Sequence, residues 1–353
     1  MPRLKLSLST FDKVGIATAL AIGILGGSVF VWLKMPLPWM IGAAVFVSVA
    51  ALAGVRVAPR IPGRDIMFAV LGVLMGAAIR PDTFDHAELW TISLGGMIVF
   101  VLVVSAVIAA VLMRCGYDRI TAYFSSVPGG LSEMILLGGQ AGGDDRVIAL
   151  IHSIRITLTV LVIGAWYRLV HGYQPNASSA LGGIADVTAI DGGALIAVAI
   201  IGWFVGTRFR LPGGTFLGPM IISAAAHGFG LTKAVPPSEL ISCAQLVVGT
   251  AIGCRFNGTS VKEFRKALVM GVVSAIGLLA LAVLAAIPLA PLVGLPFEAL
   301  LLAFAPGGLT EMSLISMTLG IDPAFVTSHH LFRLVLILMI APMLFRWLAQ
   351  RGN

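Results

Sequence analysis

Residues 128–134 read Pro-Gly-Gly-Leu-Ser-Glu-Met and residues 306–312 read Pro-Gly-Gly-Leu-Thr-Glu-Met, so one pattern occurs twice, 178 positions apart. The same separation relates further pairs on the carboxyl side of the motif: Gly142 and Gly320, Asp144 and Asp322, His152 and His330, Arg155 and Arg333, and Arg168 and Arg346. A single offset that holds without gaps over this whole stretch indicates an internal repeat.

The composition is that of a membrane protein. Hydrophobic residues make up 58% of the 353 residues and charged residues only 11%, whereas soluble domains carry about 25% charged residues. Several uncharged stretches reach the ~20 residues that an α-helix needs to cross ~30 Å of hydrocarbon. These stretches are 14–33, 37–55, 89–113, 195–207 and 267–295. The sequence therefore predicts an all-α polytopic membrane protein. Its net charge of +7 indicates basic cytoplasmic loops beside anionic lipid rather than a nucleic-acid partner.

Two patterns of small residues extend the repeat toward the amino terminus. Gly72 and Gly76 are separated by three residues, and so are Gly249 and Gly253. This spacing lets two helix backbones approach closely, so we predict helix packing at these four glycines. The predicted organisation is a cytoplasmic segment 1–13, a first membrane repeat 14–170, a linker 171–192, a second repeat 193–348 and a tail 349–353.

The distribution of Lys and Arg indicates how the two repeats insert. If each Pro-Gly-Gly element enters the membrane and returns on the same side, each repeat has five transmembrane helices and the second repeat is inverted. Most of the 23 Lys and Arg residues then lie in cytoplasmic loops, which is where basic loops are favoured. We therefore predict ten spans in two inverted repeats, each with a re-entrant or broken Pro-Gly-Gly hairpin. Both termini are expected to be cytoplasmic, in a bacterial inner membrane.

Each Pro-Gly-Gly break is expected near the middle of the bilayer. Proline removes a backbone donor and paired glycine permits a sharp turn, after which the sequence turns helical again. Two helix N-termini would then point into the protein from opposite faces, as in secondary transporters, and such termini suit an anion. The alternative is a packed kink. The predicted substrate contacts are Gly129, Gly130, Ser132, Arg155, Gly307, Gly308, Thr310 and Arg333.

Four titratable residues beside these breaks are candidates for coupling to H+ or Na+, namely Glu133, Glu311, His152 and His330. Helix capping by the carboxylates contributes ~0.3–1 kcal/mol, less than the ~2.5–3.5 kcal/mol cost of a charge in the middle of a membrane helix. Each His is followed at i+3 by an Arg on the same helix face. That Arg is expected either to pair with a hairpin Glu or to bind a substrate carboxylate or phosphate. The two His are otherwise packed, hydrogen-bonded residues.

The sequence predicts neither a metal site nor a cofactor. Its three Cys are scattered without CxxC spacing, and its six His form no HExxH pattern. Nucleotide-binding motifs are also missing from the sequence, so no enzyme activity is expected.

The duplicated motif resembles that of the AbrB family of Gram-negative membrane proteins, which contain the AbrB membrane domain twice. The resemblance spans essentially the whole chain, and members carry the labels ammonia monooxygenase or membrane regulator. From the repeat and its breaks we expect a secondary transporter of a small anionic metabolite, coupled to H+ or Na+. The alternatives are a membrane-embedded regulator or sensor of gene expression and an ammonia-monooxygenase-like enzyme. A homodimer is expected from base rates alone.

Overall fold

The computed structural model describes residues 10–58, 61–79, 87–170, 172, 182–211 and 213–350, and this part of the chain is helical without strands. The first half contains α1 (Thr10–Trp32), α2 (Pro38–Leu52), α3 (Arg64–Ala77), α4 (Ala87–Arg114), α5 (Arg119–Ser126), α6 (Leu131–Gln140) and α7 (Asp145–Leu169). The second half contains η3 (Ile184–Asp186), α8 (Ala189–Arg208), α9 (Gly214–Gly228), α10 (Ser238–Gly253), η4 (Cys254–Phe256), α11 (Val261–Val293), α12 (Phe297–Phe304), α13 (Leu309–Thr318) and α14 (Pro323–Gln350). Most of the expected amino-terminal segment, much of the expected linker and the last three residues lie outside the described residues.

The α-helices follow the same order in both halves. α1–α4 correspond to α8–α11, the pair α5 and α6 corresponds to α12 and α13, and α7 corresponds to α14. The offset of 178 residues found in the sequence relates both ends of α5 to those of α12, and both ends of α6 to those of α13. The repeated heptapeptide therefore marks the same pair of helices in each half.

Seven helices in the described part are long and apolar enough to cross a membrane: α1, α4, α7, α8, α10 as continued by η4, α11 and α14. This confirms the predicted class, an all-α polytopic membrane protein. The other three candidates, α2, α3 and α9, contain 15, 14 and 15 residues. They reach only ~22 Å at 1.5 Å per residue, less than the ~30 Å of hydrocarbon. The expected ten spans depend on these three shorter helices.

The start of α2 and the start of α9 share an unusual backbone conformation. Leu37 (φ 47°) and Gly213 (φ 59°) are left-handed immediately before these helices. Glycine adopts this conformation freely, whereas leucine does so at a steric cost. Pro38 follows Leu37 at the first helical position of α2, where a missing N–H costs nothing. The chain therefore changes direction sharply at the residue before each of these two helices.

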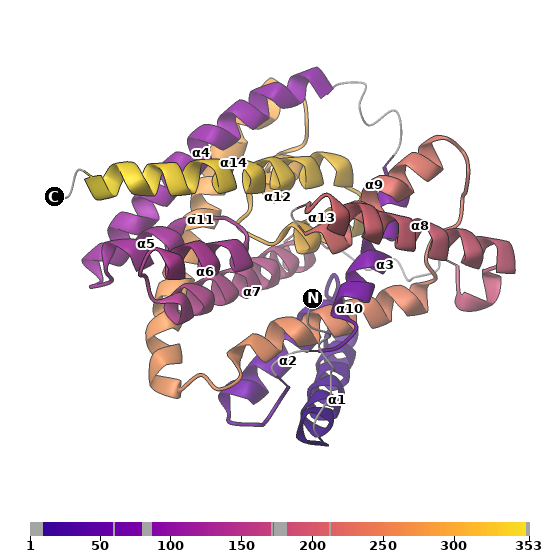
Figure 1. The fold of residues 1–353 in the computed structure, drawn as a ribbon. Coiled ribbons are helices and arrows are strands. Elements are labelled where there is room, and N and C mark those ends of the chain that lie inside the picture. The colour runs from indigo at the N-terminus through magenta and orange to yellow at the C-terminus, as the bar shows by residue number, and fades with distance from the viewer. Residues whose placement is uncertain are drawn as a thin grey trace.

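The two halves interleave instead of folding side by side. α1–α3 pack with α8–α10, and α4–α7 pack with α11–α14 (Figure 1). We call the first group the glycine bundle and the second the hairpin bundle. Contacts between the two bundles include those of α2 with α7 and of α3 with α13. Each predicted repeat, 14–170 and 193–348, is therefore a unit of sequence whose helices are divided between the two bundles. α1 and α8 each begin about one turn before the expected boundaries.

Equivalent glycine contacts join the halves within the glycine bundle. Gly72 and Gly76 of α3 pack against α9, and Gly249 and Gly253 of α10 pack against α2, which corresponds to α9. A Cβ at any of the four positions would overlap backbone or Cβ atoms of the facing helix. The contact of α3 with α9 is therefore equivalent to the contact of α10 with α2. Such a reciprocal pair of contacts is expected of two-fold related units.

In the hairpin bundle, the corresponding helices α4 and α11 lie against each other and run in opposite directions. Gly96, near the start of α4, faces Leu289, near the end of α11. Further along α4, Ile108 faces Gly277 of α11. The two copies of this helix are therefore antiparallel.

Candidate functional site

α5 and α6 form a helical hairpin whose turn is the first Pro-Gly-Gly. The backbone N–H of Asp144, which follows α6, donates to Oγ1 of Thr121 at the start of α5 over 2.9 Å. Midway along the pair, Gly138 of α6 lies against the side chain of Phe124 in α5. The two helices are therefore antiparallel, and the chain enters and leaves the hairpin at the same end.

A capping carboxylate fixes the open end of this hairpin. Asp118 precedes α5 and accepts hydrogen bonds from the backbone N–H groups of Ile120 and Thr121 at 3.0 and 2.9 Å. Burial acts to raise the pKa of Asp118, but hydrogen bonds from Thr121 and Ile120 outweigh it, so the pKa is lowered. The cap is therefore charged at neutral pH.

The second hairpin, α12 and α13, opens at the other end of the bundle. Arg146, at the start of α7, lies 3.4 Å from Glu263, at the start of α11. The ring of Trp166, near the end of α7, lies 6.5 Å from that of Phe297, which begins α12 just after α11 ends. α7 and α11 are therefore parallel, with the first hairpin opening at their starts and the second at their ends.

The two Pro-Gly-Gly tips meet around one cavity of about 60 Å³. Residues 128–131 of the first tip and 307–309 of the second line it, together with Arg155 of α7 and with His330 and Arg333 of α14. A cavity of this size holds a few water molecules or a group of similar size. Two breaks that are far apart in sequence are thus brought together, along with both arginines.

Arg333 is held by the broken end of α12. Its guanidinium donates to the carbonyl oxygens of Ala305 at 2.7 Å and Gly307 at 2.9 Å, and it contacts Nδ1 of His330 at 3.0 Å. Nε2 of His330 lies 2.9 Å from the carbonyl oxygen of Leu302. A break in a helix leaves carbonyl groups without N–H partners, and these groups attract a cation.

Arg155 occupies the equivalent place but is held less tightly. It donates to the carbonyl oxygens of Ser125 and Val127 at 3.3 and 3.4 Å, and its Nε has no partner among the described residues. Nδ1 of His152 lies 3.1 Å from the carbonyl oxygen of Ile148. Buried polar groups are normally satisfied, so Arg155 keeps an N–H donor to spare beside the cavity.

Glu133 and Glu311 do not pair with the arginines. Their carboxylates fold back over Gly130 and Gly308, at the N-termini of α6 and α13. Among the described residues, the ion pairs within 4 Å involve neither arginine of the cavity. The alternative of an internal Arg–Glu pair is therefore wrong for this arrangement. Each carboxylate instead lies at the amide end of its own helix, where a negative charge is favourable.

The helices α6 and α13 begin without side-chain caps. Their N-cap residues are Gly130 and Gly308. Thr310 is buried in the first turn of α13. Ser132 has the corresponding place in α6, and its side chain lies outside the part of the chain that the structure describes.

Sequence reasoning missed the carbonyl ligands of the arginines and a buried histidine. The helix breaks themselves were the signal for the carbonyl groups, because a broken helix exposes them. His329 is fully buried, with its ring 4.1 Å from that of Phe325 and its Nε2 2.8 Å from Oγ of Ser93. It packs between α4 and α14 and lies outside the tip cavity. No group of three or more His, Cys, Asp or Glu within the described ranges could hold a metal ion.

Comparison with known proteins agrees with the resemblance seen in the sequence. A family profile described as transition state regulatory protein AbrB matches residues 39–349. "Uncharacterized protein YhjN" of Bacillus subtilis (strain 168) is 25% identical in an alignment of 352 positions, and the match covers 93% of this chain and 92% of the relative. "Putative regulator AbrB" of Escherichia coli (strain K12) is 25% identical over 287 residues, 80% of this chain and 81% of the relative. Because the profile covers most of the chain, the protein belongs to the AbrB family.

Proposed function

We propose that this protein is a secondary transporter that carries a small anion across the bacterial inner membrane. The observation that carries the proposal is the pair of guanidinium groups, Arg155 and Arg333, on one cavity between the two Pro-Gly-Gly tips. Their side chains are 1% and 5% exposed, and an arginine cannot lose its proton. Two like charges around one cavity repel each other, so a negatively charged occupant completes the site.

The chemistry of the cavity suits a carboxylate or a phosphate. Guanidinium groups donate to two oxygens of such a group at once. α6 and α13 begin at the same tips without a side-chain cap from their N-cap residues, and a helix N-terminus favours an anion. A volume of about 60 Å³ accommodates one small anionic group. The substrate class is therefore a small anion bound through that group.

The two glutamates support coupling to protons. The carboxylates of Glu133 and Glu311 lie over the helix ends that a substrate anion would use. Protonation removes this competing negative charge, and the incoming anion restores the electrostatic balance. An anion and a proton would then bind together, which is the requirement for symport.

The directions of the helices support two inverted repeats with re-entrant hairpins. α4 and α11 are antiparallel, and the hairpins open at opposite ends of α7 and α11. Transporters built from inverted repeats hold substrate between the repeats near the bilayer midplane, on broken helices. With cytoplasmic termini, the first hairpin opens toward the cytoplasm and the second toward the opposite side.

Uptake into proteoliposomes tests the proposal. Purified protein is reconstituted and offered radiolabelled monocarboxylates, dicarboxylates and phosphate, with and without an inward proton gradient. We expect gradient-dependent uptake of at least one anion, and a loss of about tenfold or more in Arg155→Gln, because one charge-assisted contact contributes that much. Arg64→Gln is the control, since Arg64 is exposed and pairs with its neighbour Asp65. If wild type and Arg155→Gln move every anion equally slowly, the proposal is wrong.

A membrane-embedded sensor or regulator is the second candidate, favoured by the name of the Escherichia coli relative. A sensor binds its ligand without moving it. Binding of an anion to the purified protein, with no uptake into proteoliposomes under any gradient, would favour this candidate over transport.

A further inference from the structure

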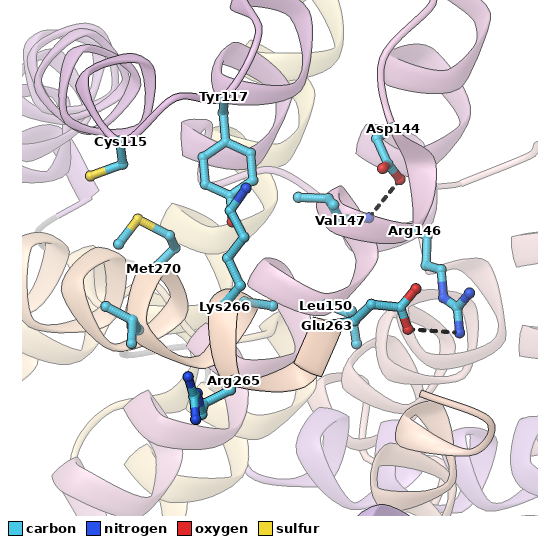
Figure 2. A pocket seen from close by; sticks show the side chains of 12 residues that line it. Cys115, Tyr117, Asp144, Arg146, Val147, Leu150, Glu263, Arg265, Lys266 and Met270 are labelled. Atoms are coloured by element: carbon cyan, nitrogen blue, oxygen red, sulfur yellow. Dashed lines mark hydrogen bonds and ion pairs between the residues drawn. The ribbon is translucent and has the colours of Figure 1, made fainter. Parts of the chain in front are cut away.

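A second cavity, of about 780 Å³, lies at the base of the first hairpin (Figure 2). The connection between α4 and α5 contributes Cys115 and Tyr117, the start of α7 contributes Asp144 and Arg146, and the first turns of α11 form the facing wall. The tip cavity shares no lining residue with it. The second cavity thus joins the hairpin of one half to a helix of the other.

The carboxylates at this cavity are already engaged by the fold. Asp144 caps α7 by accepting the backbone N–H of Val147 at 3.0 Å (Figure 2). Glu263 accepts hydrogen bonds from the N–H and hydroxyl of Ser260 at the start of α11, and it pairs with Arg146 at 3.4 Å. The negative charge of the cavity is therefore used for capping and for one ion pair.

Arg265 and Lys266 leave an excess of positive charge. Both side chains lie on an exposed part of α11. Nζ of Lys266 is 4.6 Å from the centroid of the Tyr117 ring, and Figure 2 shows this side chain extended toward the ring. In the described part of the chain, neither Arg265 nor Lys266 forms an ion pair. A contact with a neutral ring does not compensate an ammonium charge, so the site remains complementary to an anion.

The position of the cavity relates it to the membrane surface. Three candidate spans end here, because the α4 span finishes at Arg114 while the spans of α7 and α11 begin at Asp145 and Glu263. The remaining wall is apolar and consists of Val147, Leu150, Ala267, Val269 and Met270. Val269 is 53% exposed. Charged groups at the end of the spans therefore adjoin an open apolar surface along α11.

We propose that this cavity binds an anionic phospholipid. Its phosphate would lie at the basic end of the cavity, where Arg265 and Lys266 supply the excess positive charge, and one acyl chain would follow the apolar wall past Val269. Basic pockets between transmembrane helices bind lipid headgroups in this way, and each basic residue near the surface contributes to attraction. A free anion would use the cations but would leave the apolar wall uncovered. The site is independent of the proposed transport function.

Native mass spectrometry of the purified full-length protein tests this assignment. The probes are phosphatidylglycerol, phosphatidylcholine with the same acyl chains, and inorganic phosphate, all at one ionic strength. We expect retained phosphatidylglycerol on the wild type and about tenfold weaker retention in the double variant Arg265→Gln, Lys266→Gln. The double variant Lys34→Gln, Lys233→Gln removes the same charge from exposed positions elsewhere and is expected to bind as the wild type does.

Several outcomes would overturn the assignment. Equal retention of phosphatidylcholine would show that charge is not recognised. Competition by millimolar inorganic phosphate against phosphatidylglycerol would show that the ligand is a free anion. The charge-preserving variant Arg265→Lys, Lys266→Arg should retain the lipid, and its failure would attribute the loss to the fold. A failure of proteoliposome transport would leave all of these readouts unchanged.

Discussion

Replacing Arg155 and Arg333 one at a time by methionine separates a structural arginine from a ligand-binding one. The two residues are equivalent in sequence, but their bonds differ. Arg333 donates to two carbonyl oxygens at 2.7 and 2.9 Å, distances typical of charge-assisted bonds. The two bonds of Arg155 measure 3.3 and 3.4 Å, beyond the usual ~2.7–3.2 Å. Methionine retains the length of the stem and removes the charge and the donors.

The expected changes in the free energy of unfolding follow from these distances. An arginine in the middle of a membrane helix costs ~2.5–3.5 kcal/mol, and a good hydrogen bond from a charged donor contributes ~1.5–3 kcal/mol. Two short bonds offset or exceed the cost, so Arg333→Met should destabilise the protein by up to about 3 kcal/mol. Two long bonds, at about 0.5 kcal/mol each, fall short of it. Arg155→Met should therefore be neutral or stabilise the protein by about 2 kcal/mol.

Unfolding of the purified protein by SDS, followed by circular dichroism, measures this difference. Arg64→Met reports on the loss of an exposed arginine whose partner is its neighbour Asp65. A transported anion should stabilise the wild type but not Arg155→Met, because a ligand stabilises only the state that binds it. Equal losses of stability in Arg155→Met and Arg333→Met would refute this distinction, since both arginines would then stabilise the hairpins.

Three further predictions concern packing, capping and coupling. Gly72→Ala and Gly249→Ala should each lower the unfolding free energy by about 1–3 kcal/mol, because the methyl group overlaps the facing helix. Gly95→Ala adds its methyl group to open space and should leave the unfolding free energy unchanged. Equal unfolding curves for all three variants would contradict the predicted packing. Asp118→Ala should cost about 1 kcal/mol at neutral pH. Burial acts to raise the pKa of Asp118, but hydrogen bonds outweigh it and lower the pKa. The stabilisation by this cap is therefore present above the unfolded pKa of about 3.9 and is lost as the pH falls through the folded pKa. Unfolding curves of wild type and Asp118→Ala that do not converge in acid would exclude this role of the cap. Glu311→Gln should bind anions yet lose gradient-driven uptake, and uptake that still follows the proton gradient would count against proton coupling.

The sequence was sufficient to predict the helical hairpins and their sites in the chain. Pro-Gly-Gly at residues 128–130 and 306–308 marks the turn of each hairpin, because proline and glycine act locally on the backbone. The small-residue pairs also lie at close helix contacts, as their spacing indicates. The division of each half between two bundles could not be predicted, because it depends on which helices of different halves pack together. No local sequence pattern in α1–α3 indicates that these helices pack against α8–α10.

The partners of the arginines could be predicted only in part. Their charge and depth required a partner, but the sequence offered Glu133 and Glu311 as well as the substrate. The structure adds a third kind of partner, the carbonyl groups at the end of a broken helix. Such groups belong to the backbone of every residue, so the Pro-Gly-Gly break indicates that carbonyl groups are exposed but not which of them an arginine contacts. The second cavity could not be predicted for a related reason, because its two walls come from residues more than a hundred positions apart.

The two copies of the motif lie in unequal surroundings, which bears directly on the proposed transport. α13 packs against α3 and α7 of the other half, and Glu311 is 9% exposed, whereas α6 packs mainly within its own half and leaves Glu133 half-buried. Because the two motifs are nearly identical, sequence alone does not determine which one is covered. An exchange of surroundings would expose Glu311 and bury Glu133, and it would require only that the two arrangements differ by a few kcal/mol. An anion between Arg155 and Arg333 would then face the opposite side of the membrane while it kept the same two ligands.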